Sequence, residues 1–130
     1  MNRSNLLLVF LVAGAILLWS SLLQQPKAEV AFLDVGQGDA TYIRTPLGDE
    51  VVIDGGPGEA IVGQLGRIQP FADRELTLLV LTHPHRDHLE GFLALADRYR
   101  VKKLWTTGVV AATELDDQLI DKLRARGTEV

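Results

Sequence analysis

The sequence predicts an α/β (α+β) domain that follows one transmembrane helix. The first strands of this domain are expected to be antiparallel. Three features of the 130 residues carry this prediction. Residues 6–23 contain no charge. Residues 30–53 contain short β-rich segments that are separated by glycine and proline turns. From residue 59 onward, segments with the apolar spacing of helices alternate with short apolar strands, which is typical of a sheet covered by helices.

Residues 6–23 (LLLVFLVAGAILLWSSLL) are predicted to form a single-pass membrane anchor. The run has 18 residues, near the roughly 20 that cross ~30 Å of hydrocarbon, and Trp19 lies near one end, where interfacial aromatics occur. A cleaved signal peptide and a buried soluble helix are the alternatives. A polar hinge follows this segment. The predicted division is therefore an anchor with its hinge at 1–27 and a globular domain at 28–130. Arg3 favours a cell-membrane location with the globular part outside.

The globular part is expected to open with three short strands. We expect a buried strand at 30–35, its partner at 40–45 and a third strand at 51–53. The connections at 36–39 and 46–49 are short and have turn composition. Such connections favour an antiparallel meander.

Helices and strands alternate in the rest of the chain. The expected elements are a helix at 59–68, a strand at 76–81, a helix at 89–99, a strand at 101–105, a helix at 114–126 and the start of a strand at 128–130. The apolar run at 76–81 indicates burial on both faces, and Trp105 is expected in the core. Thr113 and Asp116 form a candidate capping box, with Gly127 as the helix stop. These later strands are expected to be parallel or mixed.

Composition limits the chemistry that the chain can perform. The sequence has no cysteine, which excludes disulfides and thiolate metal ligands. The net charge of −4 provides no general attraction for nucleic acid. A phosphate-bearing substrate would therefore need local attraction, for example from bound metal.

Residues 82–88 (THPHRDH) hold all the histidines of the chain. The segment follows a predicted strand and enters a predicted helix, at the kind of sheet edge where α/β proteins bind ligands. In an extended stretch His83 and His85 share a face and can reach one ion, whereas Asp87 and His88 can face a second. Histidine and carboxylate suit zinc and similar divalent ions. A solvated polar loop is the alternative, but it does not explain four potential ligands in six positions.

The pattern HxHxDH resembles the signature of the metallo-β-lactamase superfamily. The resemblance implies the N-terminal half of an αββα sandwich, in which His83 and His85 bind one ion and Asp87 and His88 bind another. It implies two divalent ions, with zinc as the default and manganese as the alternative, that activate water to hydrolyse an ester, amide or phosphodiester. Within this set Asp87 is the candidate catalytic residue.

A narrower resemblance lies in three segments, FLDVGQGDA at 32–40, IDGG at 53–56 and VLTHP at 80–84. Together they look like the hydrolase domain of ComEC-type competence proteins. This resemblance implies a membrane-anchored enzyme that degrades single-stranded DNA during DNA uptake. Stand-alone hydrolases carry similar motifs, so another ester or amide hydrolase of this fold is the second interpretation.

Two other aspartates are candidates to support the metal ligands. In the superfamily an aspartate in the position of Asp54 buttresses the metal loop by hydrogen bonding, and a simple turn residue is the alternative. Asp39 has the same two interpretations. The superfamily also needs an aspartate that bridges both ions and a further histidine, but no histidine follows His88. We therefore expect a fragment, and a non-catalytic remnant is the third interpretation.

Overall fold

The computed structural model describes residues 3–22, 27–70, 73–108 and 114–130. The helices and strands are α1 (Arg3–Leu22), β1 (Glu29–Phe32), β2 (Thr41–Arg44), β3 (Glu50–Ile53), α2 (Ala60–Ile68), β4 (Glu75–Leu81), α3 (Arg86–Arg98), β5 (Arg100–Thr106) and α4 (Glu114–Ala125). The predicted hinge falls largely on residues outside the described ones, as does the predicted cap Thr113. The order of elements agrees with the prediction.

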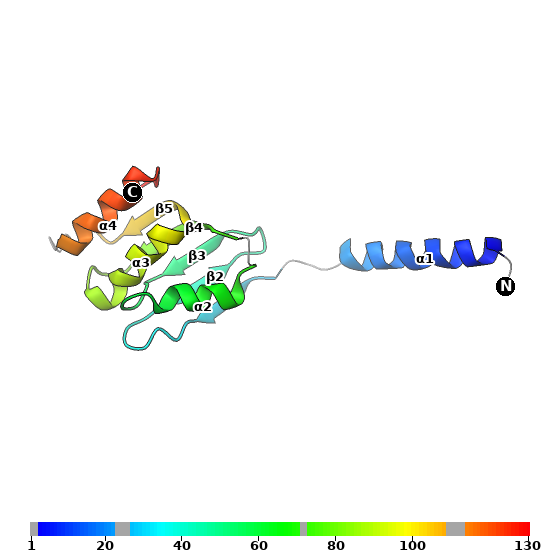
Figure 1. Ribbon diagram of the computed structural model, residues 1–130, viewed down its shortest axis with the longest axis horizontal. Helices are drawn as coiled ribbons and strands as arrows, with labels where there is room; N and C mark the ends of the chain where they lie inside the picture. The colour runs from blue at the N-terminus through cyan, green and yellow to red at the C-terminus, as the bar shows by residue number, and fades with distance from the viewer. Residues whose placement is uncertain (1–2, 23–26, 71–72, 109–113) are drawn as a thin grey trace.

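The strands form one mixed sheet in the order β1-β2-β3-β4-β5 (Figure 1). Strands β1, β2 and β3 form the predicted antiparallel meander. Strands β3, β4 and β5 run parallel to one another. Beyond β5, Glu129 makes a parallel bridge to Lys103, where the start of another strand was expected. The carboxyl ends of β3, β4 and β5 therefore meet at one edge.

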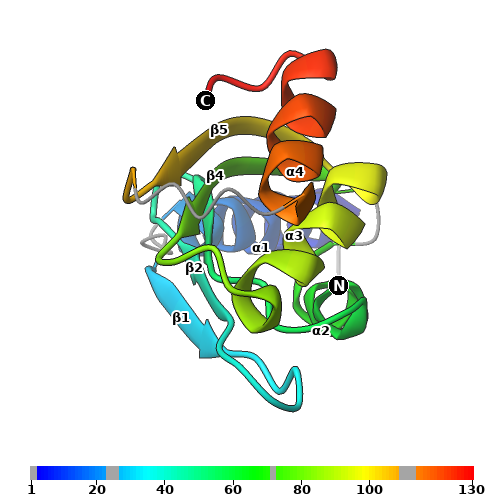
Figure 2. The ribbon, with the colours of Figure 1, turned by 90° about the vertical axis from the view of Figure 1, so that its left-hand side faces the viewer.

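Helices α2, α3 and α4 cover one face of this sheet (Figure 2). Beneath them, β4 buries Leu79 and Leu81, and α3 buries apolar residues at helical spacing, including Phe92 and Leu95. Burial of such side chains contributes about 1.5–3 kcal/mol each. This covered face is the hydrophobic core of the domain.

The opposite face of the sheet is open to solvent within the residues that the structure describes. Strand register aligns Phe32, Thr41, Ile53, Val80 and Trp105 in one row across it. Phe32 is 86% and Trp105 61% exposed. The prediction of Trp105 as core is therefore wrong, and so is that of a buried first strand, because alternate side chains point to a face that none of the described helices covers. A five-stranded sheet with one covered and one open apolar face agrees with half of the predicted sandwich.

Helix α1 lies apart from the sheet and the other helices (Figure 1). Most of its described side chains are apolar and exposed, with Leu7, Phe10, Leu17 and Trp19 each between 66% and 70% exposed. Within the described residues, no helix has both the length and the hydropathy needed to cross a membrane. The span predicted at 6–23 stays a prediction.

Candidate metal centre

The predicted metal-binding segment leaves the end of β4 and turns into α3. Helix α3 starts at Arg86, three residues before the predicted start, and His85 stands in extended conformation at its N-cap. Parallel pairing of β3 with β4 continues one residue past β3, where the Asp54 N–H donates to the Val80 carbonyl at 3.0 Å. This pairing places the Asp54 carboxylate beside the segment that holds the histidines.

Three side chains converge at this edge of the sheet, namely Asp54, His83 and His88. One ligand atom from each lies within 4.8 Å of the others. Asp54 is 3% and His88 7% exposed, while His83 is half-buried. The rings of His83 and His88 are 3.8 Å apart between centroids. Acidic and imidazole groups this close and this buried are typical of a metal site.

Asp54 connects β3 to the metal-binding segment through its carboxylate. Its Oδ1 accepts a hydrogen bond from the Thr82 N–H at 2.9 Å, and its Oδ2 accepts one from the Thr82 hydroxyl at 2.6 Å. Asp54 also has a φ of 56°, the one positive value at a non-glycine residue within the described chain. Such a conformation costs on the order of 1–3 kcal/mol and persists where surrounding contacts impose it. These contacts hold Asp54 against Thr82, and the buttressing role predicted for Asp54 stays a prediction.

The geometry at His88 tests whether these residues suit a cation. Its Nδ1 lies 2.9 Å from Asp54 Oδ2, yet no hydrogen bond joins them, and Nδ1 is a buried atom without a hydrogen-bond partner among the described residues. Such an orphaned group costs about 1–3 kcal/mol. A divalent ion bound by this cluster would satisfy it, and nitrogen and oxygen donors suit zinc. The residues therefore fit a divalent metal.

His85 and Asp87 lie on the solvent side of this cluster. The His85 ring packs edge-on against His83, with 4.7 Å between centroids. Asp87 Oδ2 lies 3.7 Å from His88 Nε2, and its side chain is 53% exposed. Two ligands of a tetrahedral zinc are roughly 3.4 Å apart when both bonds are near 2.1 Å. The two predicted ligand pairs are thus neighbours, and their assignment to two ions stays a prediction.

Asp39 is exposed and lies outside the converging cluster. Its neighbour Gly38 has a φ of 92°, and a Cβ there would stand 2.3 Å from the Asp87 carbonyl oxygen. The loop that contains Asp39 therefore approaches the metal-binding segment by its backbone. A supporting role for the Asp39 side chain stays a prediction.

The first turn of α3 is fixed by ionic contacts. Arg86 pairs with Glu90, whose other carboxylate oxygen accepts a hydrogen bond from the Gly58 N–H at 3.1 Å. The Arg86 guanidinium and this N–H hold the pKa of the Glu90 carboxyl below its usual range. The pair thus joins the loop after β3 to the helix that carries His88.

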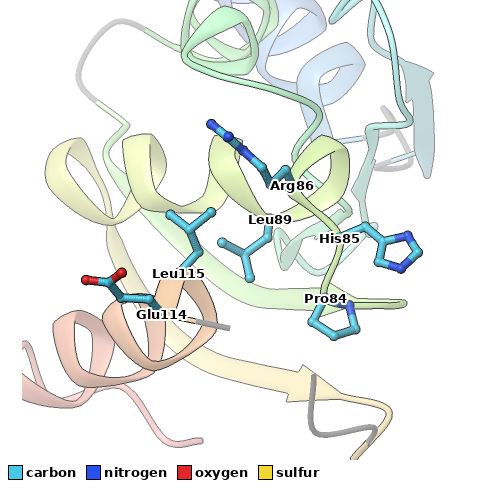
Figure 3. A pocket seen from close by; sticks show the side chains of 6 residues that line it. All are labelled: Pro84, His85, Arg86, Leu89, Glu114 and Leu115. Atoms are coloured by element: carbon cyan, nitrogen blue, oxygen red, sulfur yellow. The ribbon is translucent and has the colours of Figure 1, made fainter. Parts of the chain in front are cut away.

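A cavity of about 400 Å³ lies beside the metal-binding segment, between the starts of α3 and α4. Figure 3 shows Leu89 and Leu115 pointing toward each other across it, with Pro84 at its edge. The His85 imidazole points away from both leucines in the same view. His85 and Arg86 also line the cavity, so this largely apolar cavity adjoins the metal-binding segment.

Sequence reasoning missed one residue of the site, Thr82. Its N–H and its hydroxyl both donate to Asp54, and the same hydroxyl oxygen lies 2.9 Å from His83 Nδ1. The one signal for it in the sequence is its place directly before His83. A hydroxyl in that place is common in loops without any function, so only the structure shows its contacts.

A family model described as the metallo-beta-lactamase superfamily matches residues 33–124. The matched range includes the three converging side chains as well as His85 and Asp87. No curated protein matches the chain.

Proposed function

The chain belongs to the metallo-β-lactamase superfamily, and from this membership we propose that it is a metal-dependent phosphodiesterase that acts on single-stranded DNA in ComEC-type DNA uptake. Members of the superfamily are mostly metal-dependent hydrolases. The observation that carries the proposal is the convergence of Asp54, His83 and His88 at the carboxyl edge of the sheet. The narrower part is supported by the segments FLDVGQGDA, IDGG and VLTHP.

We assign the metal ligands as two pairs, His83 with His85 and Asp87 with His88. The nitrogen and oxygen donors and the 3.7 Å between Asp87 Oδ2 and His88 Nε2 support bound divalent metal, and the family pattern suggests two ions, with zinc as the default and manganese as the alternative. Such ions, when bound, act as Lewis acids that polarise the bond to be broken and lower the pKa of water. Asp54 holds Thr82 by two hydrogen bonds, and the side chain of Asp87 is 53% exposed to solvent.

A phosphate-bearing substrate would depend on bound metal for local attraction, because the net charge is −4. The Arg86 side chain is 78% exposed, but it pairs with Glu90, and its guanidinium points away from the His85 imidazole (Figure 3).

The full-length gene product loaded with zinc or manganese is expected to hydrolyse single-stranded DNA and bis(4-nitrophenyl) phosphate. Activity should disappear with a chelator and return when metal is added, and Asp87→Asn should lower kcat/KM at least about 100-fold. Nucleotide release and 4-nitrophenol absorbance measure these rates. Asp97→Asn, an exposed change at the far end of α3, is the matched control.

The same assay separates the alternatives. Turnover of a lactam, thioester or carboxylic ester without phosphodiester turnover would identify another hydrolase of this fold. Stoichiometric metal binding without any turnover would identify a non-catalytic protein. Metal-independent nuclease activity would contradict the proposal.

We further propose that residues 6–23 attach the protein to membrane lipid as a single-pass anchor, with the globular part outside. Support comes from the uncharged sequence and from the exposed apolar side chains of α1. An aspartate near the middle of such a segment costs about 3 kcal/mol relative to leucine.

Leu11→Asp is therefore expected to reduce partition of the full chain into phospholipid vesicles roughly 100-fold. Vesicle flotation measures the bound fraction. Leu47→Asp places the same charge at a turn of the sheet, where the leucine is 91% exposed, and should leave partition unchanged. Equal loss in both variants would mean that α1 does not mediate attachment.

A further inference from the structure

The Thr82 side chain stands between a carboxylate and a metal-ligand histidine. Its Oγ1 is 2.6 Å from Asp54 Oδ2 on one side and 2.9 Å from His83 Nδ1 on the other. The Thr82 N–H also donates to Asp54 Oδ1 at 2.9 Å. Two hydrogen bonds to one carboxylate hold the threonine in a single orientation.

A hydroxyl has one hydrogen to donate, so the two contacts of Oγ1 cannot both use it. An ionised carboxylate only accepts hydrogen bonds. If the hydroxyl hydrogen pointed at His83, two oxygens would face each other at 2.6 Å without a hydrogen between them. The hydrogen therefore lies toward Asp54, and Oγ1 is left to accept from His83.

We infer that Thr82 is a positioning residue that fixes His83 in the tautomer with hydrogen on Nδ1, so that Nε2 keeps its lone pair for the metal. A neutral imidazole carries one N–H and one lone pair, and the hydrogen bond at one nitrogen decides which atom binds metal. Asp54 thereby acts on His83 through Thr82, while its Oδ2 faces Nδ1 of His88 directly. One carboxylate thus acts on His83 through a hydrogen bond and lies beside the ring of His88.

This inference rests on the proposed metal site, but it concerns a property of the metal-free protein. With His83 in the other tautomer, Nε2 would carry hydrogen and could not bind a cation. Binding would then need a shift of the proton between the nitrogens. Thr82 removes that step by fixing the tautomer in advance.

The test is a long-range ¹H–¹⁵N correlation spectrum of the ¹⁵N-histidine-labelled, metal-free full chain at a pH where its imidazoles are neutral. The ¹⁵N shifts of His83 are expected to show the Nδ1–H tautomer in the wild type. Thr82→Val removes the hydroxyl at nearly constant shape, and should shift His83 toward the Nε2–H tautomer and weaken zinc binding about 10-fold or more. Thr82→Ser should restore both, and Thr41→Val, on the open face of the sheet, should change neither.

Two results would overturn the inference. One is the Nε2–H tautomer in the wild type, a reading that does not depend on whether Thr82→Val folds. The other is a folded Thr82→Val variant with the wild-type tautomer and zinc affinity. An Nδ1–H tautomer in a wild type that binds no zinc would support the inference and overturn the proposed function instead.

Discussion

Asparagine in place of Asp54 is expected to weaken zinc binding by roughly 10- to 100-fold while the chain stays folded. Both carboxylate oxygens face donors, namely the N–H and the hydroxyl of Thr82. An asparagine has one oxygen and one NH₂ group, so its NH₂ would face either the Thr82 N–H, which is a donor, or the Thr82 hydroxyl, which would then have to accept instead of donating to this side chain. Asparagine tolerates the positive φ of this position, so the change tests the carboxylate and not the backbone.

Zinc affinity, measured by competition with a chelating dye, separates this effect from stability. The free energy of unfolding in urea with chelator present should fall by about 1–3 kcal/mol, the usual cost of an unsatisfied buried donor. Asp97→Asn, whose carboxylate pairs with Lys122 at the surface, should change affinity and stability little. Zinc affinity within twofold of wild type in Asp54→Asn would show that Asp54 neither supports nor binds the ion.

The fold was predictable where one local rule governed each element. Short turns predicted the β1–β3 meander, and helical spacing predicted α2, α3 and α4 within a few residues. The predicted start of α3 was three residues too late, because the polar residues of its first turn do not show the apolar spacing of a helix. His85, which directly precedes the helix, is extended. Trp105 was misassigned because apolar composition does not tell which face of a sheet the helices cover.

The sequence predicts which segment holds the site, but it does not predict how the side chains of the site are arranged in space. The spacing of residues 82–88 predicts ligands, whichever strands surround them. The approach of Asp54 depends instead on parallel pairing of β3 with β4, a contact across about 28 residues of sequence that no local pattern specifies. The contacts of Thr82 depend on this pairing and on the direction of one hydroxyl, so they were beyond sequence reasoning.

A backbone contact between two glycines sets how closely α3 approaches the end of β3. The Gly55 N–H donates to the His88 carbonyl at 2.7 Å, and the Gly91 N–H donates to the Gly56 carbonyl at 2.9 Å. A Cβ on Gly91 would stand 1.9 Å from the Gly55 carbonyl oxygen, and one on Gly55 would stand 2.8 Å from the Phe92 nitrogen. Both groups met are backbone, which cannot rotate away. Only hydrogen fits at these positions while His88 remains beside Asp54.

Gly91→Ala is accordingly expected to cost about 3 kcal/mol or more of the free energy of unfolding, since overpacking against rigid backbone is at the severe end of such changes. That is a large share of the 5–15 kcal/mol typical of a domain. Gly63→Ala is the matched control because its Cβ would meet nothing within 4 Å. Replacing this helical glycine with alanine should raise the free energy of unfolding by about 0.5–1 kcal/mol. Urea unfolding of the metal-free chain measures both. A Gly91→Ala variant as stable as the wild type would show that α3 can move away from β3, and the close approach of His88 to Asp54 would then not be imposed by this contact.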